Sequence, residues 1–464
     1  MALSVKAGFR IATALRASLR HYNRHTFKSD LIAGLIVSLI ALPLSMALAI
    51  AIGLPPQHGL YTAIIAGIAA ALLGGSMTQV SGPTAAFVVI LAPIVSSLGL
   101  HGIIWCQILS GIMLLALGTA RLGKLITYVP YAVTTGFTAG IAIVIGTLSL
   151  NDFFGLGIAH LTGDYIHKVT VLAAHLSDTQ LPELTIGLLA LLTIIFFGKI
   201  THKIPSPVAG IVLGALLGLV FSHSGVQIDT LGTRFSYQTA EGLRQGIPPY
   251  APIFRWPTFE PGTLFSIPDA VELKTLLGPS MIIAALAALE SLLSATVSDG
   301  MAGTKHDPNA ELNGLGIANI LTGLASGIPA TGAIARTATN IHAGAKTPIA
   351  SVIHALFILL YVLTLAPLID YIPMSALAAL LLTVAYRMSH AKQFIHHIRT
   401  AARNDVIVLV GCFLPTVFVD MVAGVSTGVG LAIFFHLMNK AKLPRRDVKK
   451  MARDEKNILK ETLK

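Results

Sequence analysis

The sequence predicts an all-α polytopic membrane protein with fourteen transmembrane segments, arranged as two inverted repeats of seven. Composition gives the first indication, because 54% of the 464 residues are hydrophobic and only 11% are charged, against about 25% charged residues in a soluble domain. Apolar runs near the length that spans about 30 Å of hydrocarbon also follow one another closely. This close spacing argues against the alternative of several soluble domains with large apolar interiors.

The apolar runs form two sets of seven. The first set lies near residues 31–52, 59–73, 83–98, 102–119, 130–149, 185–199 and 206–222. The second set lies near residues 273–297, 312–326, 332–342, 348–368, 373–387, 405–420 and 423–438. Because seven is odd, the second set must enter the membrane from the opposite side, so two related sets of seven must be inverted repeats.

The positive charges predict the orientation of these segments. Of the 32 lysine and arginine residues, we assign only Lys168, Arg234, Arg244 and Arg255 to exterior loops. Because lysine and arginine accumulate in cytoplasmic loops, the sequence predicts a multi-pass protein of the bacterial inner (plasma) membrane with both termini in the cytoplasm. The net charge of +11 then reflects topology and attraction to anionic lipid, and it calls for no nucleic-acid partner.

Both ends of the chain are predicted to be cytoplasmic and basic. Residues 1–30 lack the apolar stretch and cleavage site of a signal peptide. Within them Arg16, Arg20 and Arg24 recur at four-residue spacing, which predicts a basic amphipathic helix on the membrane surface; a frayed leader is the alternative. Residues 439–464 form a charged tail, which is shorter than the usual minimum of about 50 residues for a domain.

Segments three and ten are predicted to be broken helices. The stretches QVSGPTAAFV (79–88) and GIPATGAIART (327–337) place glycine, proline and small residues inside apolar sequence. Two such interrupted segments at corresponding positions of the two halves indicate the substrate site of a transporter. Helix N-termini expose unpaired N–H groups and about half a positive charge, so two half-helices that point at each other favour an anion.

Glu290 is the one carboxylate placed deep inside a predicted segment. An ionisable residue at that depth is costly to insert and usually marks an ion or proton pathway. Since burial favours the neutral carboxyl, Glu290 is a candidate proton carrier, and Ser294 shares its helix face. The alternative is a structural carboxylate that caps backbone groups or pairs with Arg336.

Arg336 lies in the first turns of the second half-helix, where its guanidinium adds positive charge beside the helix N-terminus. A structural partnership with Glu290 is again the alternative. No other pattern indicates a cofactor, a metal or an enzyme. Cys106 and Cys412 lie in apolar runs, the pair His21 and His25 sits on a basic surface segment, and neither a phosphate-binding loop nor a nucleophile with its base is recognisable.

Four stretches resemble one known family: LPLSMALAIAIGLPPQHGLYTA (42–63), GPTAA (82–86), ESLLSATVSDGMAGTKHDPNAEL (290–312) and GIPATGAIARTATN (327–340). They are similar to the sulfate permease (SulP) family of anion transporters. The resemblance implies a core domain of about 31–119 and 273–368 and a gate domain of about 130–222 and 373–438. It also implies elevator-like movement of the core against the gate, and often a homodimer.

The resemblance also implies a substrate site and a coupling site. By position, the substrate-binding residues are Leu44, Ser45, Leu48, Gly82, Pro83, Thr84, Ala85, Ala86, Ala333, Ile334, Ala335, Arg336 and Thr337, and the coupling residues are Glu290 and Ser294. Three departures stand out. Leu44 occupies a position where some relatives have glutamine, and Met77 one where lysine or arginine is usual. The sequence also ends before the cytoplasmic STAS domain into which most members continue, so the chain is either a member without that domain or a truncated one.

The expected function is secondary active transport of sulfate, bicarbonate or a dicarboxylate. Sodium-coupled relatives combine the segment-eight carboxylate with hydroxyls on segments eight and ten. Ile334 stands where the second hydroxyl would be, so we expect proton-coupled symport or anion exchange. The alternatives are a sodium-dependent bicarbonate symporter and, from another class, a passive anion channel or voltage-responsive membrane protein. A nucleobase permease would share the architecture, but Arg336 favours an anion.

Overall fold

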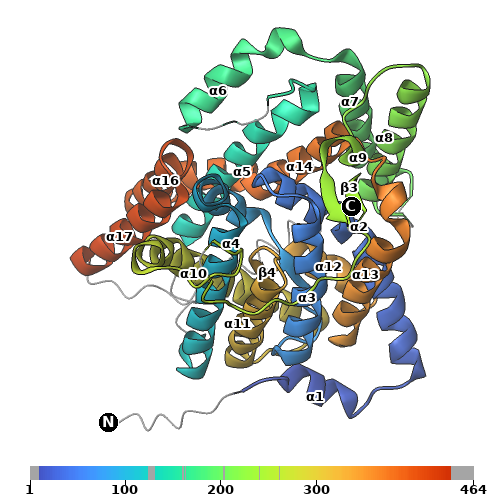
Figure 1. The fold of residues 1–464 in the computed structure, drawn as a ribbon. Coiled ribbons are helices and arrows are strands. Elements are labelled where there is room, and N and C mark those ends of the chain that lie inside the picture. Colours follow the sequence, from blue (N-terminus) through green and yellow to red (C-terminus); the bar gives the residue numbers. More distant parts are fainter. Residues whose placement is uncertain are drawn as a thin grey trace, which may run out of the picture.

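The computed structural model describes residues 10–123, 131–158, 161, 163–201, 204–239, 241–260 and 262–439, and the chain is mainly helical (Figure 1). The first half contains α1 (Thr13–Leu19), α2 (Arg24–Ala51), α3 (Gln57–Leu73), α4 (Val88–Thr119), α5 (Tyr131–Phe154), α6 (Tyr165–Ala174), α7 (Leu181–Phe196), α8 (Ser206–His223) and α9 (Leu231–Arg234). The second half contains α10 (Ala270–Ala302), α11 (Pro308–Leu324), α12 (Ile334–His342), α13 (Ile349–Ile369), α14 (Met374–Ser389), α15 (Ala391–Thr400), α16 (Arg403–Phe418) and α17 (Met421–Asn439).

Each of the fourteen predicted segments lies on a helix. Segments three and four both belong to α4, whose path breaks at Gly99, where the backbone adopts φ 59° and ψ −151°. The other segments correspond to α2, α3, α5, α7, α8, α10, α11, α12, α13, α14, α16 and α17. The all-α polytopic fold is therefore confirmed.

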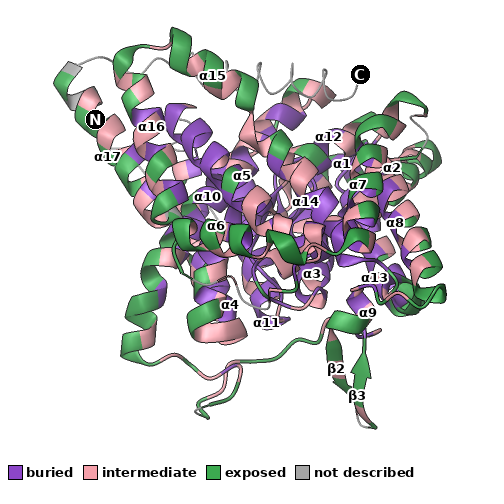
Figure 2. Ribbon diagram, turned by 90° about the horizontal axis from the view of Figure 1, so that it is seen from above, coloured by how far each residue is buried: buried purple, intermediate pink, exposed green. Residues whose placement is uncertain are grey.

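Some helices are long enough to cross a membrane, whereas α12 on a broken segment is much shorter. Within the described residues, seven helical stretches are long and apolar enough to cross a bilayer by themselves. By contrast α12, which is segment ten, has only nine residues. Buried residues gather in the middle of the molecule (Figure 2). Large apolar side chains on α7, α8 and α13 face outward, as lipid contact requires, and include Leu188, Leu192, Ile195, Val212, Leu216, Leu219, Leu356, Leu360 and Leu363.

The helix packing follows the symmetry of two inverted repeats. Segments eleven and one are α13 and α2, and their counterparts in the other repeat, segments four and eight, lie on α4 and α10. Both pairs are in contact. The same correspondence relates α13 with α3 to α4 with α11, and α16 with α5 to α7 with α14. Since all of these pairs pack together, the contacts agree with the 7+7 arrangement.

The connections between segments sort into two opposite faces. On one face, Ala12 N donates to Leu73 O at 2.6 Å, and Lys346 N donates to Asp30 Oδ1 at 2.7 Å. On the other face, Trp105 Nε1 donates to Ser266 O at 2.8 Å. These contacts join the connections before segments one, three and eleven on one face, and those before segments four and eight on the other.

The second face carries the two long connections, which contain short ordered elements. One connection holds α6, and the other holds α9 and the hairpin of β2 (Ser236–Thr239) with β3 (Gly242–Gln245). Arg234 of α9 bonds to Asp152 and Asp229, both at 2.6 Å. The ion pair with Asp152 attaches the second connection to the end of α5.

The N-terminal helix differs from the predicted one. It ends at Leu19, and α2 begins at Arg24, whose first turn is capped by the Asn23 side chain. Arg16, Arg20 and Arg24 therefore do not share one continuous helix. Instead of lying free, α1 buries Ala14 and Ser18 and contacts α3. The calls on residues 1–9 and 440–464 lie outside the described residues.

Candidate functional site

The two broken segments meet through a short antiparallel pair of strands. Strand β1 (Ser81–Pro83) pairs with β4 (Ala330–Gly332), with Gly82 opposite Thr331, and all six residues are buried. Ala333 N continues the pairing by donating to Val80 O at 2.9 Å. Each strand leads directly into a helix, so the pairing places the two helix starts beside each other.

Side chains of neighbouring helices satisfy the unwound backbone before α12. Thr62 Oγ1 and Gln107 Nε2 both donate to Ile328 O, at 3.0 and 2.9 Å. Asn319 accepts from Ala330 N at 2.9 Å and donates to Ala330 O at 3.0 Å. Backbone polar groups at membrane depth need such partners because no bulk water reaches them. The sequence analysis did not anticipate these anchors.

The unwound backbone before α4 is held in the same way from the second repeat. Ser351 Oγ donates to Gln79 O at 2.6 Å, and Asn340 Nδ2 donates to Thr78 O at 2.8 Å. Thr337 Oγ1 accepts from Val80 N at 3.0 Å. The broken segment of the first repeat is therefore fixed by residues of the second.

Arg336 is buried between the two strands and the helices around them, with 3% of its surface exposed. Its Nη2 donates to Pro83 O at 2.6 Å. Its Nε and Nη1 have no hydrogen-bond partner within the described part of the chain. A Cβ atom on Gly82 would lie 2.6 Å from Nη1. Glycine at this position thus makes room for the guanidinium.

Glu290 lies on α10 and is half-buried. Its Oε2 accepts a hydrogen bond from Thr84 Oγ1 at 3.2 Å. No ion pair joins Glu290 to Arg336 among the described residues, where the ion pairs involve other side chains. The alternative of a structural Glu290–Arg336 pair is therefore not what the structure shows.

The residues at the two helix starts are uncapped. Thr84 precedes the turn Ala85–Phe87 that leads into α4, and Ala333 precedes α12, and neither side chain bonds to the first helical turn. Ala85 and Ala86 are buried, Thr84, Ala333 and Ile334 are half-buried, and Ala335 is exposed. The first N–H groups of both helices are thus free of side-chain caps.

Ser294 and Thr337 form a buried hydroxyl pair behind the helix starts. Ser294 Oγ donates to Thr337 Oγ1 at 3.2 Å, and both residues are almost fully buried. The sequence analysis looked for a second hydroxyl at position 334, where isoleucine stands. The structure shows a hydroxyl three residues later, at Thr337.

The three residues chosen on the first segment lie together on α2, which contacts α12. Leu48 is buried in the main apolar cluster, and Leu44 packs against the same cluster. Ser45 is fully buried, and its Oγ lacks a partner among the described residues. Ser45 is thus the one hydroxyl of this trio.

The sequence analysis missed three buried carboxylates, because each lies one or two residues outside a predicted segment. Asp30, Glu183 and Glu311 are at most 2% exposed. Each accepts backbone N–H groups: Asp30 from Lys346 and Thr347, Glu183 from Asp229, and Glu311 from Gly75 and Ser76. Glu290 is therefore not the only carboxylate within the helix bundle.

Glu311 also reaches the candidate site. Its Oε1 accepts from Gln79 Nε2 at 2.8 Å and from Ser291 Oγ at 3.1 Å. Gln79 leads into β1, and Ser291 follows Glu290 on α10. Glu311 thus ties the broken segment to the helix that carries Glu290. Searched within the described ranges, the chain shows no group of three His, Cys, Asp or Glu side chains placed to hold a metal ion.

Comparison with known families matches residues 27–411 to the sulfate permease family. The chain belongs to the sulfate permease family. The putative sulfate transporter YvdB of Bacillus subtilis is 36% identical over 425 residues, which cover 91% of this chain and 76% of YvdB. The bicarbonate transporter BicA of a Picosynechococcus strain is 28% identical over 443 residues, covering 93% of this chain and 74% of BicA.

Two solved structures of anion transporters share the fold. The transmembrane domain of a cyanobacterial bicarbonate transporter BicA aligns with a TM-score of 0.72 and 27% identity, over 87% of this chain and 98% of that domain. The murine anion transporter Slc26a9, in its inward-facing state, aligns with a TM-score of 0.79 and 19% identity, over 95% of this chain and 74% of that one. This family member is an integral multi-pass membrane protein, and its relatives are anion transporters rather than enzymes.

Proposed function

We propose that this sulfate permease family member is a secondary active transporter of small anions such as sulfate, bicarbonate or a dicarboxylate, coupled to protons as a symporter or working as an anion exchanger. The observation that supports this most strongly is the junction of β1 and β4. It brings together two uncapped helix starts and Arg336, whose Nε and Nη1 lack partners in the described residues. Substrate binding is assigned to the residues around this junction.

The electrostatics of the junction favour an anion. Unpaired N–H groups at a helix N-terminus carry about half a positive charge, and a guanidinium donates charge-assisted hydrogen bonds. Arg336 uses Nη2 on Pro83 O, which leaves donors for a second acceptor. A small anion between Thr84 and Ala333 would satisfy groups that otherwise remain unpaired at membrane depth.

Glu290 provides a physical reason for proton coupling. It bonds to Thr84, the residue that precedes the first helix start, so it lies close to the proposed anion. An ionised carboxylate there would repel the anion, because like charges at close range disfavour each other in a low-dielectric site. Protonation of Glu290 removes the repulsion. Anion and proton therefore load together.

A division of the helices into two bodies supports alternating access. The helices α2, α3, α4, α10, α11, α12 and α13 surround the junction and form the proposed core, of about 31–119 and 273–368. The helices α5, α7, α8, α14, α16 and α17 form the proposed gate, of about 130–222 and 373–438. Elevator-like movement of the core would carry the anion past the gate. We place the protein in a bacterial inner membrane, as a homodimer with both termini cytoplasmic.

Sodium-dependent bicarbonate symport is the second candidate. The hydroxyl pair of Ser294 and Thr337, together with the Glu290 carboxylate, supplies oxygen atoms of the kind that bind a hard cation. Thr337 restores the segment-ten hydroxyl that the isoleucine at position 334 does not provide. Sodium would then replace the proton as the charge that balances Glu290.

Uptake into proteoliposomes distinguishes these functions. The purified chain is reconstituted, and entry of labelled sulfate and labelled bicarbonate is measured with an inward proton gradient, an inward sodium gradient or neither. We expect the proton gradient to drive accumulation of the anion. Accumulation only with sodium would favour the second candidate, and flux that never exceeds equilibrium would indicate a passive channel. The same uptake is measured in vesicles preloaded with unlabelled sulfate, where accumulation without any cation gradient would indicate an anion exchanger. No flux of any anion, with or without an internal anion and under any gradient, would refute the transport proposal.

A further inference from the structure

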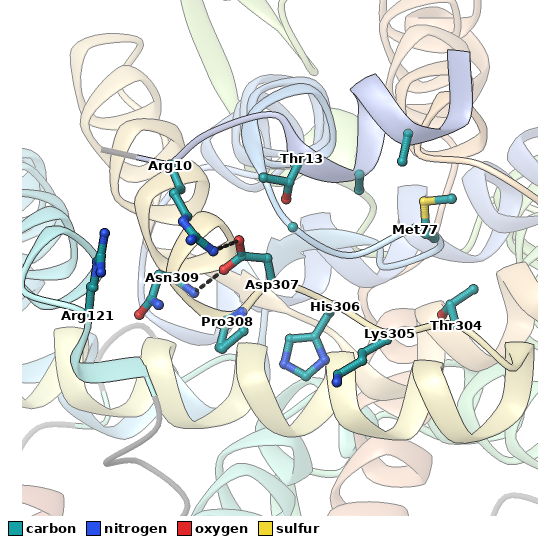
Figure 3. A pocket seen from close by; sticks show the side chains of 13 residues that line it. Arg10, Thr13, Met77, Arg121, Thr304, Lys305, His306, Asp307, Pro308 and Asn309 are labelled. Carbon is teal, nitrogen blue, oxygen red and sulfur yellow. Dashed lines mark hydrogen bonds and ion pairs between the residues drawn. The ribbon is translucent and has the colours of Figure 1, made fainter. Parts of the chain in front are cut away.

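A cavity of about 710 Å³ lies on the face of the molecule that carries α1, and none of the candidate site residues lines it (Figure 3). Its walls come from four parts of the chain that are distant in sequence. They include Arg10 and Thr13 at the start of α1, Gly75 after α3, Arg121 after α4, and Lys305 and Asp307 between α10 and α11. We call this feature the α1 cavity.

Basic groups outnumber acidic groups around the α1 cavity. Its one carboxylate, Asp307, pairs with Arg10 through Oδ2 at 3.2 Å and caps α11 by accepting from Asn309 N at 3.1 Å through Oδ1. Within the described chain, Arg121 and Lys305 take part in no ion pair. Two positive charges therefore remain unbalanced around the cavity.

The walls of the α1 cavity are fixed by hydrogen bonds. Asn313 Nδ2 donates to Arg10 O at 3.0 Å, which holds the start of the N-terminal segment against α11. Gly123 N donates to Asn309 Oδ1 at 3.3 Å, which fastens the end of α4 to the same helix. Arg121 itself has φ 59°, a left-handed conformation that costs energy for a side chain larger than glycine. The Arg121 side chain itself is exposed.

A hydroxyl in the same cavity also lacks a partner. Thr13 Oγ1 is buried from solvent, and it makes no hydrogen bond within the described residues. A buried hydroxyl without a partner carries an energetic cost that a bound acceptor would remove. Thr13 is thus a polar residue of the cavity wall whose hydroxyl has no partner of its own among the described residues.

We propose that the α1 cavity binds a phosphate-bearing ligand, such as an anionic lipid headgroup or a free phosphate compound. Its volume falls within the range of roughly 300 to 1,000 Å³ typical of ligand sites. Arginine and lysine are the side chains that most often recognise phosphate. The phosphate oxygens would accept from Arg121, Lys305 and the Thr13 hydroxyl. The proposal does not depend on the function assigned to the β1–β4 junction.

Ligand titration of the purified full chain in neutral detergent tests the proposal. Two probes are used, inorganic pyrophosphate and short-chain dihexanoyl phosphatidic acid, with direct binding and thermal midpoint as readouts. A ligand that binds only the folded protein raises its midpoint. We expect saturable binding of at least one probe, weakened by roughly tenfold or more in Arg121→Asn/Lys305→Gln, since two charged contacts are lost.

The variants are chosen so that a folding defect does not imitate a binding defect. Asparagine tolerates the left-handed conformation at position 121, and Lys305→Gln alone alters one exposed side chain and should also weaken binding. Arg16→Gln, on the same helix α1 but outside the cavity, should bind like the wild type.

The outcomes separate the sources of the phosphate. Binding of both probes indicates that phosphate alone suffices, and binding of phosphatidic acid only indicates a lipid headgroup. The proposal is overturned if neither probe saturates the wild type, if the cavity variants bind like the wild type, or if Arg16→Gln weakens binding as much as the cavity variants do.

Discussion

Thr84 donates its hydroxyl hydrogen to Oε2 of Glu290 across 3.2 Å, which joins the first repeat to the second at the start of a half-helix. The preceding residue, Pro83, accepts from Arg336 of the second repeat. Two consecutive residues of one repeat thus hold the two ionisable side chains of the other. The junction thus holds a carboxylate and a guanidinium that form no ion pair with each other among the described residues.

The first prediction concerns Glu290→Gln. Glutamine imitates the protonated carboxyl, so we expect the anion to bind while the proton gradient no longer drives its accumulation. Uptake of labelled sulfate, which stays a dianion between about pH 5.5 and 8, should lose its pH dependence over that range, since the titrating carboxyl of Glu290 is gone. Glu260→Gln, on an exposed connection, is the control. Unchanged rate and unchanged pH dependence would rule out the assigned role of Glu290.

The second prediction concerns the charge of Arg336. Arg336→Gln should weaken anion binding by roughly tenfold to a hundredfold, because a hydrogen bond to a charged group contributes about 1.5–3 kcal/mol. Arg399→Gln, on the exposed surface of α15, should leave the affinity unchanged. The concentration dependence of uptake and direct anion titration give the two affinities. Equal affinity of both variants would show that the guanidinium does not contact the anion.

The third prediction concerns the space beside Gly82. A methyl group in Gly82→Ala would lie 2.6 Å from Arg336 Nη1, so the guanidinium must shift or the strand must move. We expect transport to fall to about a tenth or less, in line with the sensitivity of sites to displacements of about 1 Å. Gly430→Ala, where a Cβ would meet nothing within 4 Å, is the matched control. Normal transport in Gly82→Ala would place the guanidinium elsewhere.

The fourth prediction concerns stability. Glu311 accepts hydrogen bonds at both carboxylate oxygens, and glutamine would turn one of them into a donor that faces other donors. Glu311→Gln should lower the free energy of unfolding by about 1–3 kcal/mol, the cost of buried unsatisfied groups. The thermal midpoint in detergent reports this change, with Glu260→Gln for comparison. A midpoint equal to the wild type would mean that the Glu311 network contributes little.

The sequence predicted the segments because hydrophobic runs and glycine or proline interruptions are local signals. Gly82 and Pro83 marked one broken helix, and Pro329 marked the other. Each of these two interruptions lies just before the start of a helix, α4 in the first repeat and α12 in the second. Local signals also identified Glu290 and Arg336 as candidate site residues, since a charged residue inside an apolar run can be recognised from the sequence alone. Their placement at the junction agrees with the hypothesis for the site, while their roles stay predictions.

Contacts between distant residues were beyond the reach of the sequence. Nothing in the residues around Gln79 indicates that its side chain donates a hydrogen bond to Glu311. Hydrophobic periodicity likewise does not show that the Thr337 hydroxyl accepts a hydrogen bond from Val80 N. Glu311 was missed because segment nine was predicted to begin near residue 312, whereas the helix begins at Pro308. A carboxylate at the edge of an apolar run is better regarded as a possible cap for a neighbouring segment than as a loop residue.

The pairing of β1 with β4 has a consequence for biogenesis. Pro83 and its partner Arg336 are 253 positions apart, so the first half of the chain is synthesised and inserted long before its counterpart exists. During that interval the unwound backbone at Gln79 and Val80 lacks the side chains that later hold it. The nascent first half therefore enters the bilayer without the partners of this stretch, and synthesis of the second half is the step that completes the β1–β4 junction.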